Sequence, residues 1–220
     1  MKGSASELLT QAAAEMGLSL SDSQVEKFAL YLAELREWNK KINLTALKTD
    51  QEIVSKHFID SLTPLPLIPP HSHILDIGSG AGFPGIPLKI AEPAFYIVMV
   101  EAKEKKVFFL RHIIRALGLQ EIRAEHLHLD PVMAREPQWH EKFDVVISRA
   151  AFDLKTFLEL SRFLLREKGH AIALKGPQVQ EEIDAVGRDI RLHAFHLVND
   201  LEVTLPITHE RRRILLYRII

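Results

Sequence analysis

The stretch LDIGSGAGFPGIPL, residues 75–88, constrains the fold of this chain most, because it sets four glycines and two prolines between an apolar run and a predicted helix. Glycines at such a junction allow a tight turn and the close approach of a ligand to the backbone. Pro84 and Pro87 suit the first turn of a helix, where a missing N–H group matters little. The stretch therefore predicts a strand, a ligand-binding loop and a helix in succession, and it leaves the ligand open.

Residues 71–220 show the alternation expected of a mostly parallel sheet. Short apolar runs alternate with helical patterns such as AKEKKVFFLRHIIRALG, in which Gly118 is the expected C-cap. Nearly continuous apolar strands separated by helices indicate an α/β fold with helices on both faces of the sheet. The last two runs have no helix between them, so we expect them to pair antiparallel. The seven predicted strands lie at 73–78, 95–101, 122–129, 143–148, 170–175, 193–203 and 211–220.

The first 70 residues are predicted to form a helical extension that packs on this sheet. The segment SDSQVEKFALYLAELREWNKK opens with a capping box between Ser21 and Gln24 and continues with apolar residues at helical spacing. A shorter helix is expected at about residues 7–16, and another runs from Asp50 to the break TPLPLIPP. We therefore expect two parts, an extension over residues 1–70 and a ligand-binding domain over residues 71–220.

Composition excludes several classes of function. The chain has no cysteine, which rules out disulfides, thiolate metal sites and cysteine nucleophiles. A formal net charge of −1 argues against a protein that coats nucleic acid by bulk electrostatics, although a local basic face is compatible with it. The 11 histidines lack zincin spacing, so we expect no functional metal. No apolar run suits a signal peptide or a membrane span, which makes the cytoplasm the expected compartment.

In the glycine loop, Gly80, Gly82 and Gly85 satisfy the dinucleotide fingerprint G-x-G-x-x-G. The glycine directly after the strand is Gly78, however, so the register is wrong for NAD. Asp76 sets a carboxylate in the strand end, where it must be hydrogen-bonded to the loop or to a ligand. A Walker A loop is excluded because no Gly-Lys-Ser or Gly-Lys-Thr follows. An acidic residue followed by alternating glycines resembles class I methyltransferases.

Glu101 ends the second predicted strand and supports a nucleoside ligand. A carboxylate at this position accepts hydrogen bonds from both ribose hydroxyls of an adenosine, in NAD and S-adenosylmethionine sites alike. Alternatively, the Glu101 carboxylate serves only to cap the helix that starts near Lys103 and binds no ligand.

Further motifs resemble the glucose-inhibited division protein B family. The matching pieces are DIGSGAGFPGIPL, NLTA at 43–46, KHFIDSL at 56–62, ISRA at 147–150, ALKG at 173–176 and HERRRILLYRI at 209–219. They cover the chain from about Asn43 to its C-terminus in unbroken order. Members of that family are bacterial 16S ribosomal RNA guanine-N7 methyltransferases that use S-adenosylmethionine. The resemblance implies a Rossmann-like class I methyltransferase fold, the same cofactor and the same class of substrate for this chain.

The resemblance also implies which residues serve the cofactor. The family carries an acidic residue after its third strand. Counting from Ile122 without a gap brings Leu129 and Asp130 to that place, whereas a count with a gap brings Glu125 there. We prefer the first, because IRAEHLHL is then long enough to be a strand. The residues expected at the cofactor are Asp76, Gly78, Ser79, Gly80, Phe83, Glu101, Leu129, Asp130 and Arg149.

A second group of residues is implied on the substrate side. Guanine N7 already has an in-plane lone pair, so its methylation needs neither a general base nor a covalent catalyst. The lack of cysteine agrees with this, as does SRAAFD, which stands where amino-group methyltransferases carry an Asn/Asp-Pro-Pro-aromatic motif. The candidates are Arg149, Lys175, Asn43, His57, Asp60 and Arg211.

The expected partner is 16S ribosomal RNA, within the small ribosomal subunit, bound by a monomeric enzyme that needs neither metal nor membrane. Two alternatives remain open, a small-molecule methyltransferase on the same fold and a non-catalytic RNA-binding module. The guanine that is modified is also left open. Basic side chains that are candidates for RNA contacts are Lys40, Lys41, Lys105, Lys106, Arg111, Arg115 and Arg211 to Arg213.

Overall fold

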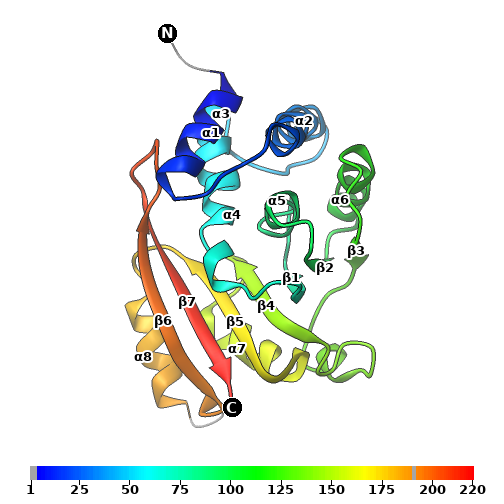
Figure 1. The fold of residues 1–220 in the computed structure, drawn as a ribbon. Helices are drawn as coiled ribbons and strands as arrows, with labels where there is room; N and C mark the ends of the chain where they lie inside the picture. Colours follow the sequence, from blue (N-terminus) through cyan, green and yellow to red (C-terminus); the bar gives the residue numbers. More distant parts are fainter. Residues whose placement is uncertain (1–3, 190–191) are drawn as a thin grey trace.

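The computed structural model describes residues 4–189 and 192–220, which contain one seven-stranded sheet (Figure 1). The strand order is β3-β2-β1-β4-β5-β7-β6, and all pairings are parallel except the two made by β7. The order reverses between β1 and β4, and in open α/β sheets ligands bind at the carboxyl ends of the strands beside such a point. The strands are β1 (His73–Ile77), β2 (Tyr96–Glu101), β3 (Ile122–His126), β4 (Phe143–Arg149), β5 (Leu165–Lys175), β6 (Phe195–Thr204) and β7 (Arg211–Ile219).

Helices cover both faces of this sheet, which confirms the predicted α/β class (Figure 1). Two buried apolar clusters separate them from the strands, one under α1, α2, α5 and α6 and the other under α7 and α8. No helix in the described part of the chain is long and apolar enough to cross a membrane. The helices are α1 (Ala5–Glu15), α2 (Asp22–Asn39), α3 (Asp50–Ile53), η1 (Val54–Ile59), α4 (Asp60–Leu62), η2 (Leu65–Leu67), α5 (Gly85–Ala91), α6 (Glu104–Ala116), η3 (Met133–Arg135), α7 (Leu154–Leu164) and α8 (Gln180–Arg188).

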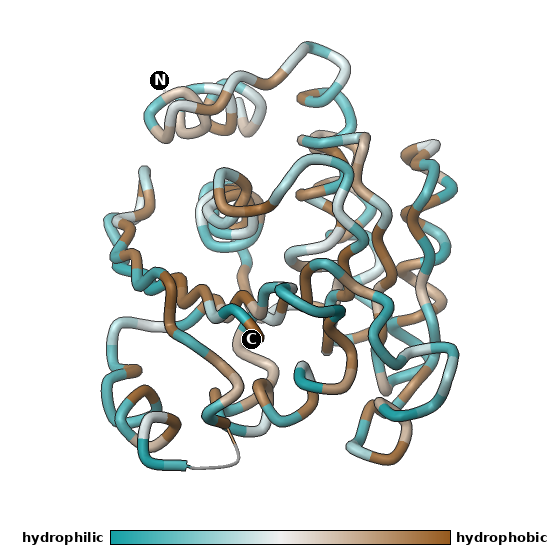
Figure 2. The backbone as a smooth tube through the Cα atoms, turned by 60° about the horizontal axis from the view of Figure 1, so that its bottom comes forward, coloured by the Kyte–Doolittle hydropathy of each residue, from teal (hydrophilic) through white to brown (hydrophobic). Residues whose placement is uncertain are grey.

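Local sequence signals explain where several of these elements begin and end. The capping box predicted at Ser21 and Gln24 is present at the start of α2. Gly118 follows α6 with a φ of 60°, as expected of a glycine that ends a helix. Figure 2 shows hydrophilic and hydrophobic residues alternating along the helical coils at the outside of the molecule. The amphipathic pattern of the sequence therefore corresponds to helices that shield the apolar inner strands β1, β2 and β4.

The helix expected after Asp50 is present, but its pitch changes on the way. The α-helical turn α3 continues into η1, which is π-helical, and then into α4 without a break. A π-helical turn inserts extra backbone and is found mostly at functional sites. His57 lies in η1 and Asp60 begins α4. The π-helical turn therefore carries His57 and ends directly before Asp60, the second predicted substrate-side residue of this segment.

Candidate active site

The glycine loop leaves β1 at the carboxyl edge of the sheet in a conformation that favours glycine. Gly78, Gly80 and Gly82 have φ values of 71°, 59° and 99°, which L side chains rarely adopt. The Gly78 amide donates to the Val100 carbonyl at 2.9 Å, which ties the loop to β2. A Cβ on Gly78 would lie 2.6 Å from the Cβ of Ala151, so the loop also packs closely on the segment after β4.

Asp76 lies fully buried in β1 beneath this loop. Its Oδ2 accepts a hydrogen bond from the Gly85 amide at 3.0 Å, and a Cβ on Gly85 would come within 2.8 Å of that oxygen. Oδ1 has no hydrogen-bond partner in the described part of the chain. Burial raises the pKa of Asp76 to about 7, against the opposing effect of the Gly85 hydrogen bond. Oδ2 of Asp76 therefore holds the glycine loop, and Oδ1 can still accept a hydrogen bond.

Glu101 meets the same loop from the end of β2. Its Oε2 accepts from the Gly80 amide at 3.0 Å, and its Oε1 accepts from the Lys103 amide at 2.8 Å. The capping role and the loop-binding role are thus both present. Because a carboxylate offers about four acceptor positions, two remain for hydroxyl donors. The space beside Gly80 is open, since the nearest atom to a Cβ there, Lys106 Nζ, is 3.8 Å away.

Arg149, at the end of β4, joins the loop to the helical segment 50–62. Its Nη1 donates to the Lys56 carbonyl at 2.7 Å and to Asp60 Oδ2 at 3.3 Å. Its Nη2 donates to His57 Nδ1 at 3.0 Å. The guanidinium also lies over the Phe83 ring, 5.0 Å from its centre, which is within cation–π range. The His57 ring stacks on Phe83 with 4.4 Å between centroids, so three distant segments meet here.

His57 is an uncharged, oriented ring in this cluster. Burial lowers its pKa to about 3, and the Arg149 cation adds to the effect. Arginine is a donor only, so Nδ1 accepts from Arg149 and the ring proton lies on Nε2. That Nε2 then donates to Thr45 Oγ1 at 2.7 Å. The 3.2 Å approach of Nδ1 to the Lys56 carbonyl is accordingly a contact and not a hydrogen bond.

A buried carboxylate, that of Asp60, connects Arg149 to Arg212. Asp60 is only 4% exposed, and its Oδ1 lies 3.3 Å from Arg212 Nε. Burial raises the pKa of Asp60, and the two guanidinium groups oppose that rise. Arg212 also pairs with Glu210 at 2.8 Å, and Glu210 pairs with Lys56 at 2.6 Å. Three cations therefore face two carboxylates, so the net charge is positive. We call these five residues together with His57 the Arg149 cluster: Lys56, His57, Asp60, Arg149, Glu210 and Arg212.

The segment between β6 and β7 is attached to the helical segment 50–62 by a second set of contacts. Ser55 Oγ donates to the Pro206 carbonyl at 2.9 Å and lies 2.8 Å from Thr208 Oγ1. Ser55 is fully buried, so these contacts are shielded from water. The end of the chain is thus fixed against residues near its beginning.

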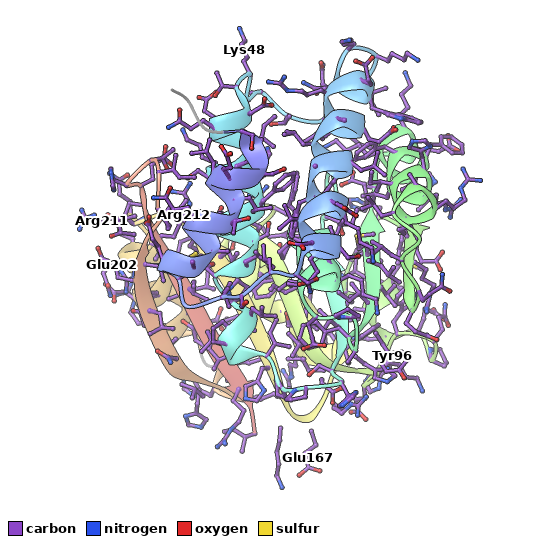
Figure 3. All side chains as sticks on the ribbon, turned by 45° about the horizontal axis from the view of Figure 1, so that its top comes forward. Lys48, Tyr96, Glu167, Glu202, Arg211 and Arg212 are labelled. Atoms are coloured by element: carbon purple, nitrogen blue, oxygen red, sulfur yellow. The ribbon has the colours of Figure 1, made fainter. Side chains whose placement is uncertain are left out.

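The structure places Arg212, and not the predicted Arg211, at the cluster. The Arg211 side chain is 64% exposed and pairs with Glu202 of β6 at 3.0 Å. Figure 3 shows Arg211 and Glu202 together at the outer edge of the molecule, with Arg212 farther in. Successive side chains of a strand point to opposite faces, so a displacement by one residue along β7 exchanges the inner and outer arginine.

Two other predicted substrate-side residues lie apart from the Arg149 cluster. Lys175 Nζ donates to the Phe152 carbonyl at 2.7 Å and pairs with Glu182 at 2.8 Å, which ties the loop after β4 to α8. Asn43 is exposed in the loop that follows α2. This loop is held instead by Asn39, whose side chain makes three hydrogen bonds to its backbone.

The reason for preferring Asp130 over Glu125 is wrong, because β3 ends at His126 and IRAEHLHL is not one strand. Asp130 Oδ1 accepts from the amides of two residues that follow it, a local bond that competes with strand pairing. Glu125 lies inside β3, opposite Val100. Leu129 is buried beyond the strand end. Asp130 and Leu129 therefore follow the carboxyl end of the strand, and their contact with the cofactor stays a prediction.

Tyr31 and Thr45 are site residues that sequence reasoning missed, and Arg212 was named only among the candidates for RNA contacts. Tyr31 of α2 is fully buried and donates to the Ala81 carbonyl in the glycine loop at 2.5 Å. Its ring also stacks on Phe83, with 5.4 Å between centroids. A buried tyrosine hydroxyl needs a hydrogen-bond partner, so a tyrosine at an apolar position of α2 was the feature of the sequence that could have indicated this contact. Thr45 is part of the NLTA motif, but the motif does not indicate that Thr45 bonds to His57.

The sequence of residues 24–212 matches the family GidB, described as rRNA small subunit methyltransferase G. The chain belongs to this family. Ribosomal RNA small subunit methyltransferase G of Geotalea uraniireducens is 40% identical over 212 residues, which are 96% of this chain and 95% of that protein. The protein of the same name from Geobacter metallireducens is 39% identical over 215 residues, 98% of this chain and 96% of that one. The GidB resemblance predicted from the motifs is thereby confirmed.

Solved structures agree with the GidB assignment at the level of the fold. A methyltransferase from Geobacter sulfurreducens superposes with a TM-score of 0.58 at 14% identity, covering 87% of this chain and 90% of that one. A SAM-dependent methyltransferase from Aquifex aeolicus gives 0.57 at 16% identity, with 86% and 98% covered. The fold is the predicted Rossmann-like class I methyltransferase fold. S-adenosylmethionine is the cofactor, and the open side of Gly80 and the spare acceptor positions of Glu101 fit it.

The buried Asp76 predicts how stability depends on pH. The native state keeps the proton up to about pH 7, whereas the unfolded chain loses it near 3.8. This group's contribution to stability is therefore present at low pH and is lost as the pH rises from about 4 to about 7. We expect wild type to lose, over this window, on the order of a few kcal/mol relative to Asp76→Asn. Urea unfolding of both proteins at several pH values measures the difference, and a constant difference would contradict the assignment.

Proposed function

We propose that this GidB enzyme transfers the methyl group of S-adenosylmethionine to N7 of a guanine in small-subunit (16S) ribosomal RNA. The observation that carries the proposal is the Arg149 cluster, which lies against the cofactor loop and has no free general base among the described residues. The His57 lone pair at Nδ1 is taken by Arg149, and Asp60 lies between two arginines.

The lack of a free base selects among acceptors. An exocyclic amine must lose a proton on methylation, which calls for a base within hydrogen-bond reach. Guanine N7 attacks with an existing lone pair and loses no proton in the transfer step. When bound, S-adenosylmethionine supplies an electrophilic methyl group on a sulfonium. The task left to the protein is to orient the base and to shape the electrostatic environment, as a cluster of fixed arginines does.

Arg149 keeps donors for the substrate. Of the five N–H groups of a guanidinium, three are used here, two on Nη1 and one on Nη2. The remaining two suit a carbonyl oxygen or a phosphate, and arginine to the guanine edge is the commonest specific base contact. A bond to guanine O6 leaves N7 free for the methyl group. We therefore propose Arg149 as the residue that holds the target base.

Several finer properties complete the proposal. We propose that the substrate is presented by the small ribosomal subunit and that a cytoplasmic monomer acts on it without a metal. We propose further that residues 1–70 are an extension of the catalytic domain 71–220. Tyr31 supports this, because a residue of the extension bonds directly to the glycine loop.

Mass spectrometry of nucleosides tests the proposed function. Small-subunit rRNA from a strain that lacks the gene should lack one 7-methylguanosine, and purified protein with S-adenosylmethionine should restore it. Transfer to a different position, or a tritium label that appears in a metabolite and never in RNA, would overturn the proposal.

The two neighbouring arginines of β7 offer a matched test of the site. We expect Arg212→Ala to lower kcat/KM for methyl transfer by roughly 10- to 100-fold, because Asp60 loses one of its two cations and is free to shift, and Arg149, which pairs with Asp60, shifts with it. Arg211→Ala, on the exposed side of the same strand, should stay within about twofold by the same reasoning. Affinity for S-adenosylhomocysteine should change in neither variant. A larger loss of activity in Arg211→Ala than in Arg212→Ala would show that Arg211, as the sequence motif predicted, is the arginine that serves the site.

A further inference from the structure

An exposed aromatic side chain stands in the middle of the outer face of α6. Phe108 is 53% exposed, more than any other aromatic residue in the described part of the chain. Its neighbours Val107 and Phe109 are buried against the core, at 1% and 0% exposure. The helix therefore buries its own apolar stripe as expected and carries Phe108 in addition, on the side that faces water.

Cations surround this aromatic residue. Lys105 and Arg111 lie three positions before and after Phe108, and Arg115 lies seven after it, all exposed and on the same side of the helix. Within α6 the charges are four cations, from Lys105, Lys106, Arg111 and Arg115, against the one carboxylate of Glu104, a balance of +3. The whole chain has a formal net charge of −1, so the positive charge is concentrated locally. We call Lys105, Phe108, Arg111 and Arg115 the Phe108 platform.

The Phe108 platform lies near the cofactor loop at the carboxyl edge of the sheet. Helix α6 begins three residues after Glu101, whose carboxylate meets the glycine loop. Phe108 lies about one helical turn, roughly 6 Å, beyond the start of the helix. The Lys106 side chain of the same helix reaches back to the loop, where its Nζ is 3.8 Å from the Cβ position of Gly80. A single rigid helix thus connects the cofactor loop to the platform.

We propose that the Phe108 platform docks an unpaired nucleotide of the RNA substrate, with the base stacked on Phe108 and the flanking phosphates beside Lys105, Arg111 and Arg115. An aromatic ring among cations is the arrangement by which proteins hold single-stranded RNA. The charge balance of +3 favours RNA over a protein partner, because a single exposed ring among cations suits a polyanion with unpaired bases, whereas the core of a protein interface is depleted in charged residues. The inference rests on the proposed RNA substrate and adds a second point of attachment outside the reaction centre.

Steady-state kinetics with a matched control tests the platform. Phe108→Ala should raise KM for protein-free small-subunit rRNA by about 5- to 30-fold, the range expected for one lost stacking contact. kcat and the affinity for S-adenosylhomocysteine should not change. Tyr96→Ala removes the other strongly exposed aromatic ring, which is 42% exposed and begins β2 at the opposite edge of the sheet. The control should leave KM unchanged.

A binding measurement that needs no methyl transfer separates this inference from the proposed function. In Phe108→Trp, titration with an unstructured eight-nucleotide RNA should quench the added fluorescence, while wild type, with only its own two tryptophans, should respond little. Adding Lys105→Ala and Arg115→Ala should weaken the quenching and reduce its dependence on salt. Quenching without any methylation of rRNA would retain the platform and reject the proposed function.

Two outcomes would overturn the platform while the proposed function stands. One is an unchanged KM in Phe108→Ala together with no quenching in Phe108→Trp. The other is a KM that rises only on protein-containing subunits and not on protein-free rRNA, because that result would assign the patch to a ribosomal protein.

Discussion

Gly80→Val should abolish cofactor binding, with affinity for S-adenosylhomocysteine reduced at least 100-fold, which corresponds to about 2.7 kcal/mol. The space beside Gly80 is open in the folded chain, and Glu101 accepts from its amide at the same point. A valine side chain would occupy the space that the nucleoside needs next to this carboxylate. Calorimetric titration measures the loss. Undiminished binding would show that the ligand does not approach the loop at Gly80.

Gly118→Val is the matched control for this substitution. Gly118 has a φ of 60°, almost the value of 59° at Gly80, and no atom of the described chain lies within 4 Å of its Cβ position. Both variants therefore impose the same left-handed strain, on the order of 1–2 kcal/mol, without a close contact. We expect similar decreases in Tm and a loss of binding only at Gly80. A loss of binding in both would attribute the effect to general destabilisation.

Arg149→Ala should lower kcat/KM for rRNA methylation by roughly 10²- to 10³-fold, the size of effect seen when a fixed donor to the reacting group is removed. The structure adds a second consequence, since Asp60 is buried and would keep only Arg212 as a counter-ion. Losing one partner of a buried pair destabilises by about 3–5 kcal/mol, and the remaining arginine should reduce this to about 1–3 kcal/mol. Methyl-transfer kinetics and urea unfolding measure the two effects separately.

The double variant Arg149→Ala, Asp60→Asn distinguishes the two consequences. Asparagine keeps the shape of Asp60 but carries no charge, so the double variant should recover much of the lost stability. Activity should stay low, because the guanidinium that faces the cofactor loop is still missing. Recovery of activity along with stability would mean that Arg149 acts only through the fold.

The positions of the inner strands were predictable, because β1, β2 and β4 are buried on both faces and therefore read as apolar runs. The beginning of β5 was not predictable. It starts at Leu165, five residues before the expected run, through a pairing of Leu165 with Phe143 and an exposed stretch that includes Arg166. Backbone pairing at the solvent-exposed end of a sheet needs no apolar side chains, so the hydropathy pattern carries no trace of it.

The two halves of the site differ in how far the sequence reveals them. The cofactor loop is local, so the spacing of Asp76, its glycines and Glu101 predicts most of its geometry. The Arg149 cluster unites residues about 90 positions apart, and only the family resemblance brought His57 and Asp60 to attention. The choice between neighbouring arginines of β7 depends on which face of the strand each occupies, which the register with β5 and β6 decides.

The contact between Asp60 and Arg212 makes the Arg149 cluster depend on a strand that is inserted between two others. β7 follows β6 in the chain, yet it lies between β5 and β6 in the sheet and supplies the second guanidinium to Asp60. The glycine loop and the strands around it can form before β7 is inserted, whereas the Arg149 cluster is complete only when β7 has paired with β5. We therefore expect cofactor binding to precede methyl-transfer activity during folding.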